Sequence, residues 1–407
     1  MTFNFRNILL ISLFVIIVIG AGFAIYIFFF RGPAEEVPIT PVDEDGVPIT
    51  ELPEAEVGEL PEGVEVVPPS ELEVASPVAI GGLTQIDTIT PITAVRNATL
   101  SGDGQGMNFY DVNSGQFNKV LADGTIQTLS DEVFYNVDDI TWSGDGNSAI
   151  LEYPDGSNVV YDFQTKQQVT LPKHWEDFDF SPQGDQIVSK SMGLDPDNRW
   201  LIVSDRDGSN AEAIEPLGNN ADKVQVSWSP NNQVIATSRT GQPMGINQQQ
   251  VLLVGKNQEN FPGLVVEGWG FDYEWSPTGD RMMYDVYNMD SGYNPTLWIV
   301  DASGGNTGLN RRYLKVNTWA DKCSFSGNTT IYCAVPDYLP EGAGLQPELA
   351  DDIPDTIYKI DTATGKKTII GKPEDASTIK QLSISDDGKY LFYIDQLTDR
   401  LNKMQLK

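Results

Sequence analysis

The sequence predicts an all-β protein, a seven-bladed β-propeller, and three observations support this prediction. A short turn motif of the form Trp275-Ser276-Pro277-Thr278-Gly279-Asp280 recurs along the chain, with its serine at positions 101, 143, 181, 229, 276, 326 and 385. Successive serines are 38 to 59 residues apart, and a period of about 40 to 50 residues is typical of propeller blades. The segments between the turns have the pattern of apolar residues that is typical of β-strands. Seven copies favour seven blades over six or eight.

Each repeat has room for four strands, which we name a to d. The Ser-Pro-x-Gly-Asp turn joins strand a to strand b, because proline presets φ at the second turn position and glycine accepts a positive φ. In the fifth repeat, residues 281–286 read as strand b and residues 297–301 as strand c, and a second hairpin follows. The aromatic residue before the serine is expected to pack between blades. These residues are Trp142, Phe180, Trp228, Trp275 and Phe325.

These motifs resemble the TolB-type, WD40-like (PD40) propeller repeat, a Trp-Ser-Pro-Asp-Gly turn followed by an apolar strand and an Ile-Trp/Tyr-x-x-Asp strand. The resemblance covers residues 95–407 and implies the fold. The Trp-Asp dipeptide of true WD40 repeats is missing, and no catalytic domain of the prolyl-oligopeptidase kind follows the repeats. The amino-terminal domain of TolB is not evident either, so the resemblance implies no particular partner.

The last repeat, from residue 378 to residue 407, has room for only three strands. An incomplete blade would leave an exposed sheet edge, which β proteins avoid. The segment from Leu83 to Thr90 precedes the first repeat and can supply the missing outer strand. We therefore expect the two ends of residues 81–407 to be tied together in one blade.

An apolar run from Ile8 to Phe30 predicts a transmembrane helix, because 23 residues at about 1.5 Å each span a bilayer core of about 30 Å. Residues 1–31 read as a short cytoplasmic tail and an uncleaved signal anchor. Arg6 precedes the run, and a short tail followed by a long chain favours a propeller on the extracytoplasmic side. The predicted location is the cytoplasmic membrane, crossed once.

Residues 32–80 read as an extended, disordered linker. They contain nine prolines and many Glu and Asp but no Lys or Arg. Neither a helix nor a central strand tolerates that density of proline. The formal net charge of the chain is −32, which argues against nucleic acid and anionic lipid headgroups as partners, since both need a basic surface.

The long irregular segments of the repeats are b–c connections, at residues 191–199, 240–250, 287–295 and 337–355. In a four-stranded blade these and the d–a connections emerge on one face, and functional loops gather in this way on a rigid scaffold. Aromatic and arginine side chains are enriched at binding hot spots. The candidate binding residues on this face are His174, Trp175, Arg199, Trp269, Tyr293, Arg311, Arg312, Trp319 and Tyr338.

No catalytic, metal or cofactor site is expected. His174 is the sole histidine, which excludes histidine-rich zinc sites and leaves no triad context. Carboxylates are abundant, but abundance does not show that two of them are paired for glycoside chemistry. Cys323 and Cys333 flank the sixth turn, and the sequence leaves a disulfide and two buried thiols equally open.

Two functions remain after these exclusions. The first is a membrane-anchored binding module for a protein or a cell-envelope polymer, with no catalysis evident. The alternative is a propeller-type hydrolase or lyase that acts on envelope saccharides with carboxylates and Tyr293 or Tyr338 nearby. A pair of carboxylates in the central channel or on the loop face would favour the enzyme.

Overall fold

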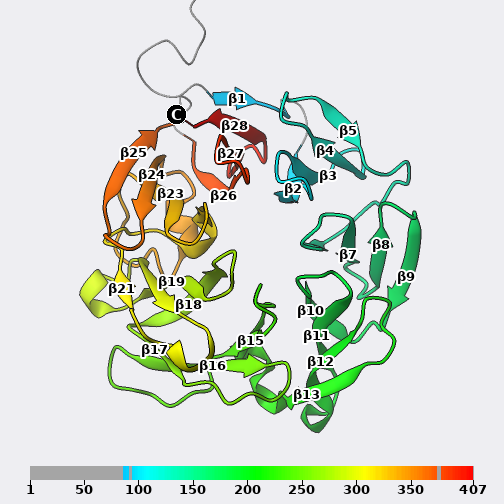
Figure 1. Ribbon diagram of the computed structural model, residues 1–407, viewed down its shortest axis with the longest axis horizontal. Coiled ribbons are helices and arrows are strands. Elements are labelled where there is room, and N and C mark those ends of the chain that lie inside the picture. The colour runs from blue at the N-terminus through cyan, green and yellow to red at the C-terminus, as the bar shows by residue number, and fades with distance from the viewer. Residues whose placement is uncertain (1–85, 91–93, 374–376, 407) are drawn as a thin grey trace, which may run out of the picture. The chain divides into compact units, whose positions relative to one another are not determined.

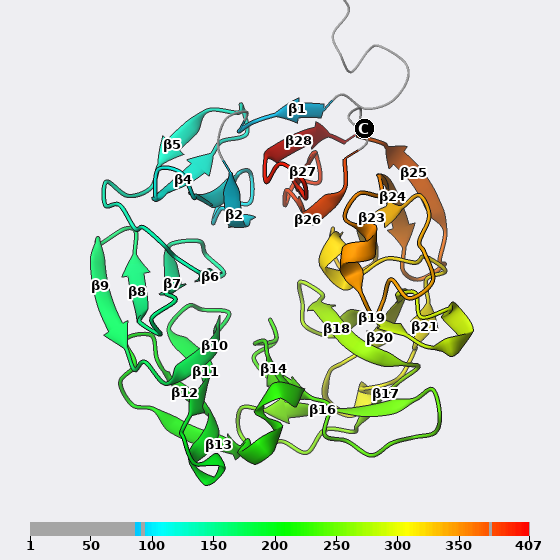
Figure 2. The same ribbon diagram turned by 180° about the vertical axis from the view of Figure 1, so that it is seen from behind.

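The computed structural model describes residues 86–90, 94–373 and 377–406, all within one compact unit, Val74–Lys407. In these residues, 28 β-strands form seven four-stranded antiparallel sheets. The sheets follow one another around a common axis, as Figures 1 and 2 show from opposite sides. The all-β, seven-bladed propeller is confirmed for this part of the chain. The predicted membrane helix at 8–30 and the linker at 32–80 lie outside the described residues.

Each blade runs from an inner strand a to an outer strand d. The strands of blades 1 to 3 are β2 (Val95–Leu100), β3 (Met107–Asp111), β4 (Gln116–Val120) and β5 (Ile126–Thr128); β6 (Asp139–Trp142), β7 (Ser148–Glu152), β8 (Asn158–Asp162) and β9 (Gln167–Leu171); and β10 (Trp175–Phe180), β11 (Gln186–Met192), β12 (Arg199–Asp205) and β13 (Glu212–Pro216). Those of blades 4 and 5 are β14 (Val224–Val226), β15 (Val234–Ser238), β16 (Gln249–Gly255) and β17 (Leu264–Val266); and β18 (Trp269–Trp275), β19 (Arg281–Tyr287), β20 (Thr296–Asp301) and β21 (Arg312–Tyr313). Those of blades 6 and 7 are β22 (Cys323–Phe325), β23 (Thr330–Pro336), β24 (Asp355–Asp361) and β25 (Lys367–Gly371); and β26 (Ile379–Ile384), β27 (Tyr390–Asp395), β28 (Leu401–Gln405) and β1 (Ile86–Thr88).

Blade 7 takes its outer strand from the other end of the propeller sequence. Strand β1 pairs antiparallel with β28, with Asp87 opposite Lys403. Beyond the strand, the Thr90 hydroxyl accepts a hydrogen bond from the Leu401 amide at 2.8 Å. This is the predicted closure, and it leaves no three-stranded blade with an open edge.

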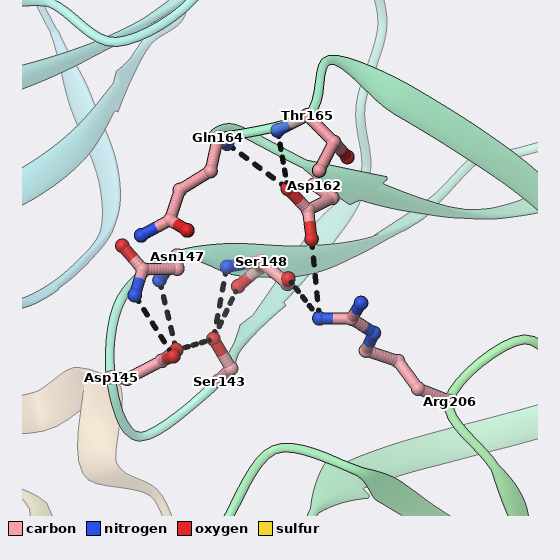
Figure 3. A network of polar contacts seen from close by, with 8 residues as sticks. All are labelled: Ser143, Asp145, Asn147, Ser148, Asp162, Gln164, Thr165 and Arg206. Atoms are coloured by element: carbon pink, nitrogen blue, oxygen red, sulfur yellow. Dashed lines mark hydrogen bonds and ion pairs between the residues drawn. The ribbon is translucent and has the colours of Figure 1, made fainter.

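In six of the seven repeats, all but that of blade 6, the serine of the turn is buried and organises the turn through its hydroxyl. In blade 2, Ser143 Oγ donates to Asp145 Oδ1 at 2.6 Å and accepts from the Ser148 amide at 3.0 Å (Figure 3). The same pair of contacts recurs at Ser101, Ser181, Ser276 and Ser385. The side chain thus closes the turn and satisfies the first amide of strand b, which is why serine recurs there.

Polar contacts near these turns also join one blade to the next. Arg206, in the c–d hairpin of blade 3, donates from Nη1 to Ser148 Oγ and lies 3.2 Å from Asp162 Oδ2, both in blade 2 (Figure 3). Between the blades, apolar side chains form separate buried clusters, such as Phe117, Tyr161 and their neighbours between blades 1 and 2. The described scaffold is therefore held together at each interface between blades and offers rigid support for loops.

Six short 3₁₀ helices lie in the described connections: η1 (Pro196–Asn198), η2 (Gly218–Lys223), η3 (Met289–Ser291), η4 (Gly304–Asn306), η5 (Ala320–Lys322) and η6 (Pro347–Ala350). Among the described residues, none of the helices has the length and apolarity needed to cross a membrane.

Candidate functional site

The b–c connections divide the blades into two groups. In blades 3 to 6 they span residues 193–198, 239–248, 288–295 and 337–354, and we call these four segments the loop crescent. In blades 1, 2 and 7 the same connections are tight turns of four or five residues. Since every blade has the same strand order, all of these segments emerge on one face. The predicted long-loop face is therefore built by four consecutive blades.

Each loop of the crescent exposes an apolar side chain. Leu194 is fully exposed, Ile246 is 81% exposed, and Met289 and Tyr338 are exposed as well. Single exposed apolar side chains are ordinary on protein surfaces, but four of them on neighbouring long loops of one face are typical of an interaction site. The crescent therefore offers a surface for a partner.

A cleft of about 710 Å³ lies between blades 5 and 6, and we call it the 5/6 cleft. Blade 5 contributes polar residues of its crescent loop, residues of β20 and the residues that follow β20 in strand d and beyond: Asn288, Asp290, Ser291, Asn294, Thr296, Trp298, Tyr313, Lys315, Val316 and Asn317. Blade 6 contributes residues 335–339, Tyr358 of β24 and Lys367 of β25. Its volume falls within the range of about 300 to 1,000 Å³ that is common for ligand sites.

Aromatic rings form a fixed wall of the 5/6 cleft. The Trp298 ring is stacked on Tyr284, with centroids 6.3 Å apart and planes at 11°, and Tyr313 packs against it at 5.3 Å. The Trp298 indole N–H donates to Thr296 Oγ1 at 3.1 Å, which fixes the ring in its plane. Packing and the hydrogen bond together hold this surface ready before a ligand arrives.

The 5/6 cleft carries charges of both signs. Lys367 Nζ donates to the Lys315 carbonyl at 2.8 Å and so bridges the outer parts of blades 5 and 6. Asp337 forms an ion pair with Lys372, and this neighbour lowers the pKa of Asp337. Among the described residues, no carboxylate lies within ion-pair distance of Lys315 or Lys367. The two ammonium groups are therefore available to an anionic ligand.

The structure scatters the nine predicted binding residues over the face and its surroundings. Tyr338 is the one that lines the 5/6 cleft. His174 is exposed beside blade 3, Arg199 donates to the Gly193 carbonyl at 3.1 Å, and Trp319 packs on the Lys322 ammonium at 5.6 Å. Trp269 is 37% exposed at the start of β18, and Tyr293 is half-buried in the loop after β19.

Three of the predicted positions need correction. Trp175 is only 6% exposed and belongs to the apolar cluster between blades 2 and 3, because the first residue of β10 already points into the blade. Arg311 and Arg312 are not in a d–a connection, since β21 begins at Arg312. Arg311 pairs with Glu267 at 2.6 Å, and Arg312 donates to the Ala363 carbonyl.

Sequence reasoning missed Trp298, Tyr313, Lys315 and Tyr358, which line the 5/6 cleft. The three aromatic residues lie on strands c and d, where the repeat pattern assigns aromatic residues to packing. One feature of the sequence could have indicated them: Trp298 and Tyr358 lie in strands β20 and β24, which directly follow the loops at 288–295 and 337–354.

The central channel holds a pair of carboxylates with raised pKa values. Glu274 and Asp321 line one cavity of about 530 Å³ together with Arg96, Asn97 and Lys380 from other blades. Their side chains meet the water of the channel but are enclosed by its walls. Removal from bulk water and the charges of nearby aspartates raise the pKa of Glu274 to about 8 and that of Asp321 to about 6.

The structure joins Cys323 and Cys333 in a disulfide bond. The two residues are directly opposite each other on β22 and β23, so the bond links strands a and b of blade 6. Within the described part of the chain, no cluster of three or more His, Cys, Asp or Glu side chains is placed to hold a metal ion.

Comparison with known proteins identifies the fold and goes no further. No protein-family model matches the sequence, and no curated protein sequence matches it. An oligogalacturonate lyase in complex with manganese has a TM-score of 0.52 at 12% identity, covering 80% of this chain and 93% of the lyase. The Cps50 (Swd1) propeller domain of Myceliophteria thermophila has a TM-score of 0.53 at 9% identity, with coverages of 79% and 100%. An oligogalacturonate lyase from Vibrio parahaemolyticus has a TM-score of 0.53 at 10% identity, with coverages of 79% and 93%. At these identities, similarity to two oligogalacturonate lyases and to a propeller domain establishes the fold alone.

Proposed function

We propose that this chain is a binding propeller that holds a protein or a cell-envelope polymer on its long-loop face. The observation that supports this proposal is the loop crescent. Four consecutive blades have b–c loops of six to eighteen residues, each with an exposed apolar side chain, whereas the other three have turns of four or five residues on the same face. The 5/6 cleft lies between two neighbouring blades of this group and gives the face a concave site.

We further propose that residues 8–30 anchor the chain in the cytoplasmic membrane and that the propeller acts on the extracytoplasmic side. The apolar run at 8–30 and its flanking charges support the anchor. The Cys323–Cys333 disulfide is in keeping with an oxidising compartment. An acidic, proline-rich segment at 32–80 suits a spacer between the membrane and the propeller.

The test is a capture experiment with the full-length chain on detergent-solubilised envelope. The test variant combines Ile246→Ser with Tyr338→Ala, two exposed residues of the crescent. Its control is Leu309→Ser, an exposed apolar residue (54%) in the c–d hairpin of blade 5, on the opposite face. We expect the crescent variant to lose the captured protein or polymer and the control to retain it. Equal capture by all three chains would remove the long-loop face from the proposal.

A second candidate function is cleavage of an envelope saccharide in the central channel. It is favoured by Glu274 and Asp321, because a carboxyl group with a pKa near 8 keeps its proton at neutral pH and can act as a general acid. The test is a screen of envelope saccharides for new reducing ends or unsaturated products. Cleavage by the unchanged chain that is lost in Glu274→Gln would establish this function, and absence of cleavage by the unchanged chain would reject it.

A further inference from the structure

The 5/6 cleft combines two kinds of surface that a sugar ring requires. A pyranose has an apolar face of C–H bonds and a rim of hydroxyl groups, so its site needs flat apolar surface beside hydrogen-bonding groups. The rings of Trp298, Tyr313 and Tyr358 supply the flat surface, and Tyr338 lies exposed at the rim. The stacking of Trp298 on Tyr284 keeps the wall rigid, so little conformational entropy is lost on binding.

Two amide side chains in the cleft are oriented by the protein and keep one end free. Asn317 donates from Nδ2 to the Pro295 carbonyl at 2.9 Å, and the Asn294 Oδ1 accepts from the Ala343 amide at 3.3 Å. Among the described residues, Asn317 Oδ1 and Asn294 Nδ2 have no hydrogen-bond partner. One is an acceptor and the other a donor, which suits hydroxyl groups because a hydroxyl both donates and accepts.

The two lysines of the cleft add a preference for negative charge. In a chain with a net charge of −32, most surface sites repel anions, so two ammonium groups without a carboxylate partner in the described structure stand out. The backbone supports their placement: Lys315 has φ of 59°, a left-handed conformation that residues other than glycine rarely adopt. The carbonyl of this residue is held by Lys367 at 2.8 Å.

Asp290 is the carboxylate of the cleft without a cationic partner in the described structure, and it accepts from Asn247 Nδ2 at 3.3 Å. The acidic Asp337 is neutralised by Lys372. The cleft therefore keeps one carboxylate as an acceptor for hydroxyl groups beside two cations, which is a mixed set rather than a purely cationic one. Such a set fits a ligand that carries hydroxyl groups and carboxylates together better than a simple anion.

We propose that the 5/6 cleft binds a short stretch of an acidic polysaccharide, with sugar rings on the Trp298–Tyr313 wall and a uronate-type carboxylate at Lys315 and Lys367. This inference rests on the proposed binding function and names the ligand class of the long-loop face. A neutral saccharide and a protein partner are the competing occupants. Both are outcomes of the test below.

The test measures binding of three probes to the full-length chain by titration calorimetry. The probes are a β-1,4-linked glucuronate tetrasaccharide, cellotetraose, which lacks the carboxylates, and tetraglutamate, which carries carboxylates without sugar rings. We expect the uronate to bind most tightly and tetraglutamate not to bind. Rising salt concentration should weaken binding of the uronate and leave binding of cellotetraose unchanged, because salt screens the interaction between exposed charges.

The matched variants are Lys315→Gln and Lys366→Gln. Lys366 lies next to Lys367 in sequence but in the c–d turn of blade 6, away from the cleft lining. Lys315→Gln should lower the affinity for the uronate about tenfold, because one charge-assisted hydrogen bond is lost. Lys366→Gln should leave this affinity unchanged. Tyr338→Ala should weaken both saccharides.

Three results would overturn the inference. Equal binding of uronate and cellotetraose with no effect of Lys315→Gln would make the cleft a neutral-sugar site. If Lys315→Gln and Lys366→Gln weaken uronate binding equally, the preference for the uronate comes from the overall charge of the surface and not from the cleft. No saccharide binding, together with a protein captured through Ile246 and Tyr338, would reject the saccharide while leaving the proposed function intact. Loss of the proposed function itself would show in the capture experiment, where the crescent variant would behave like its Leu309→Ser control.

Discussion

The side chains of Lys322 and Asp355 form an ion pair inside the protein, with 2.8 Å between Nζ and Oδ2. Asp355 is completely buried at the start of β24, and Lys322 is nearly so at the end of η5. Asp355 Oδ2 also accepts a hydrogen bond at 2.6 Å from the backbone amide of Ile379, the first residue of β26. One carboxylate thus ties the entry of blade 6 to the inner strand of blade 7.

Removing the cation alone should be severely destabilising. In Lys322→Met the buried carboxylate loses its partner, and breaking a buried pair in this way costs about 3 to 5 kcal/mol. The double variant Lys322→Met with Asp355→Asn should recover much of that loss, because the charge is gone and the amide oxygen can still accept from Ile379. Urea unfolding of both variants measures the difference. Equal loss in the single and double variants would show that the pair contributes through packing instead of charge.

Asp285 should make the stability of the propeller depend on pH. It is 2% exposed in β19 and accepts from the Ala320 amide at 2.8 Å. Burial raises the pKa of Asp285 well above its ordinary value, and the charges of Asp272 and Asp321 add to the shift. A raised folded pKa means that the stabilisation is complete below the unfolded pKa, about 3.9, and is lost as pH rises through the folded pKa.

The variant Asp285→Asn therefore should gain stability relative to the unchanged chain as pH rises from 4 to 8, because asparagine keeps the acceptor and never ionises. Melting temperatures across this range measure the gain. Asp207→Asn is the control: hydrogen bonds from Ser209 lower the pKa of Asp207, so the stabilisation it gives is present above the unfolded pKa of about 3.9 and the difference for this variant should stay nearly constant from pH 5 to 8. A melting-temperature difference for Asp285→Asn that does not change with pH would contradict the prediction.

Closure of blade 7 by β1 predicts a sharp boundary for N-terminal truncation. A chain that begins at residue 81 retains β1 and should fold as the full propeller does. A chain that begins at residue 94 lacks β1 and Thr90, so β28 becomes an exposed edge and the Leu401 amide loses its partner. The shorter chain should unfold at lower temperature and self-associate, as light scattering and thermal unfolding would report. Two truncations of equal stability and mass would mean that closure adds nothing.

The architecture could be predicted because it depends on repeated local chemistry. Ser276 and its equivalents make short-range contacts within one turn, so seven copies can be counted in a sequence. The closure by β1 could be predicted because the last repeat has room for only three of the four strands that a blade needs. Both deductions rest on patterns within a few residues or on the number of strands per blade.

The 5/6 cleft could not be predicted in the same way, because it depends on how two blades face each other. Trp298 and Tyr358 occupy strand positions whose pattern is that of packing residues, yet they line a cleft that blades 5 and 6 form together. Trp175 is the converse case, since its position next to a connection predicts an exposed side chain, whereas the structure buries it. Burial at the first residue of a strand depends on the neighbouring blade and is not encoded locally.

The repeated serine gives the last prediction, a contrast between Ser276 and Ser326. Ser276 is fully buried, accepts from the Arg281 amide at 3.1 Å and donates to Asp280 at 3.0 Å. Ser326 occupies the same position in blade 6 but is half-buried, and its hydroxyl has no hydrogen-bond partner among the described residues. Ser276→Ala should therefore cost about 1 to 3 kcal/mol, because it leaves the Arg281 amide buried and unpaired, whereas Ser326→Ala should stay within about 0.5 kcal/mol. Urea unfolding of the two variants measures both costs on the same scaffold. Because both changes remove one oxygen from the same repeat position, helix or strand propensity cannot explain a difference. Equal costs would show that serine recurs for the shape of the turn and not for the hydrogen bond to strand b.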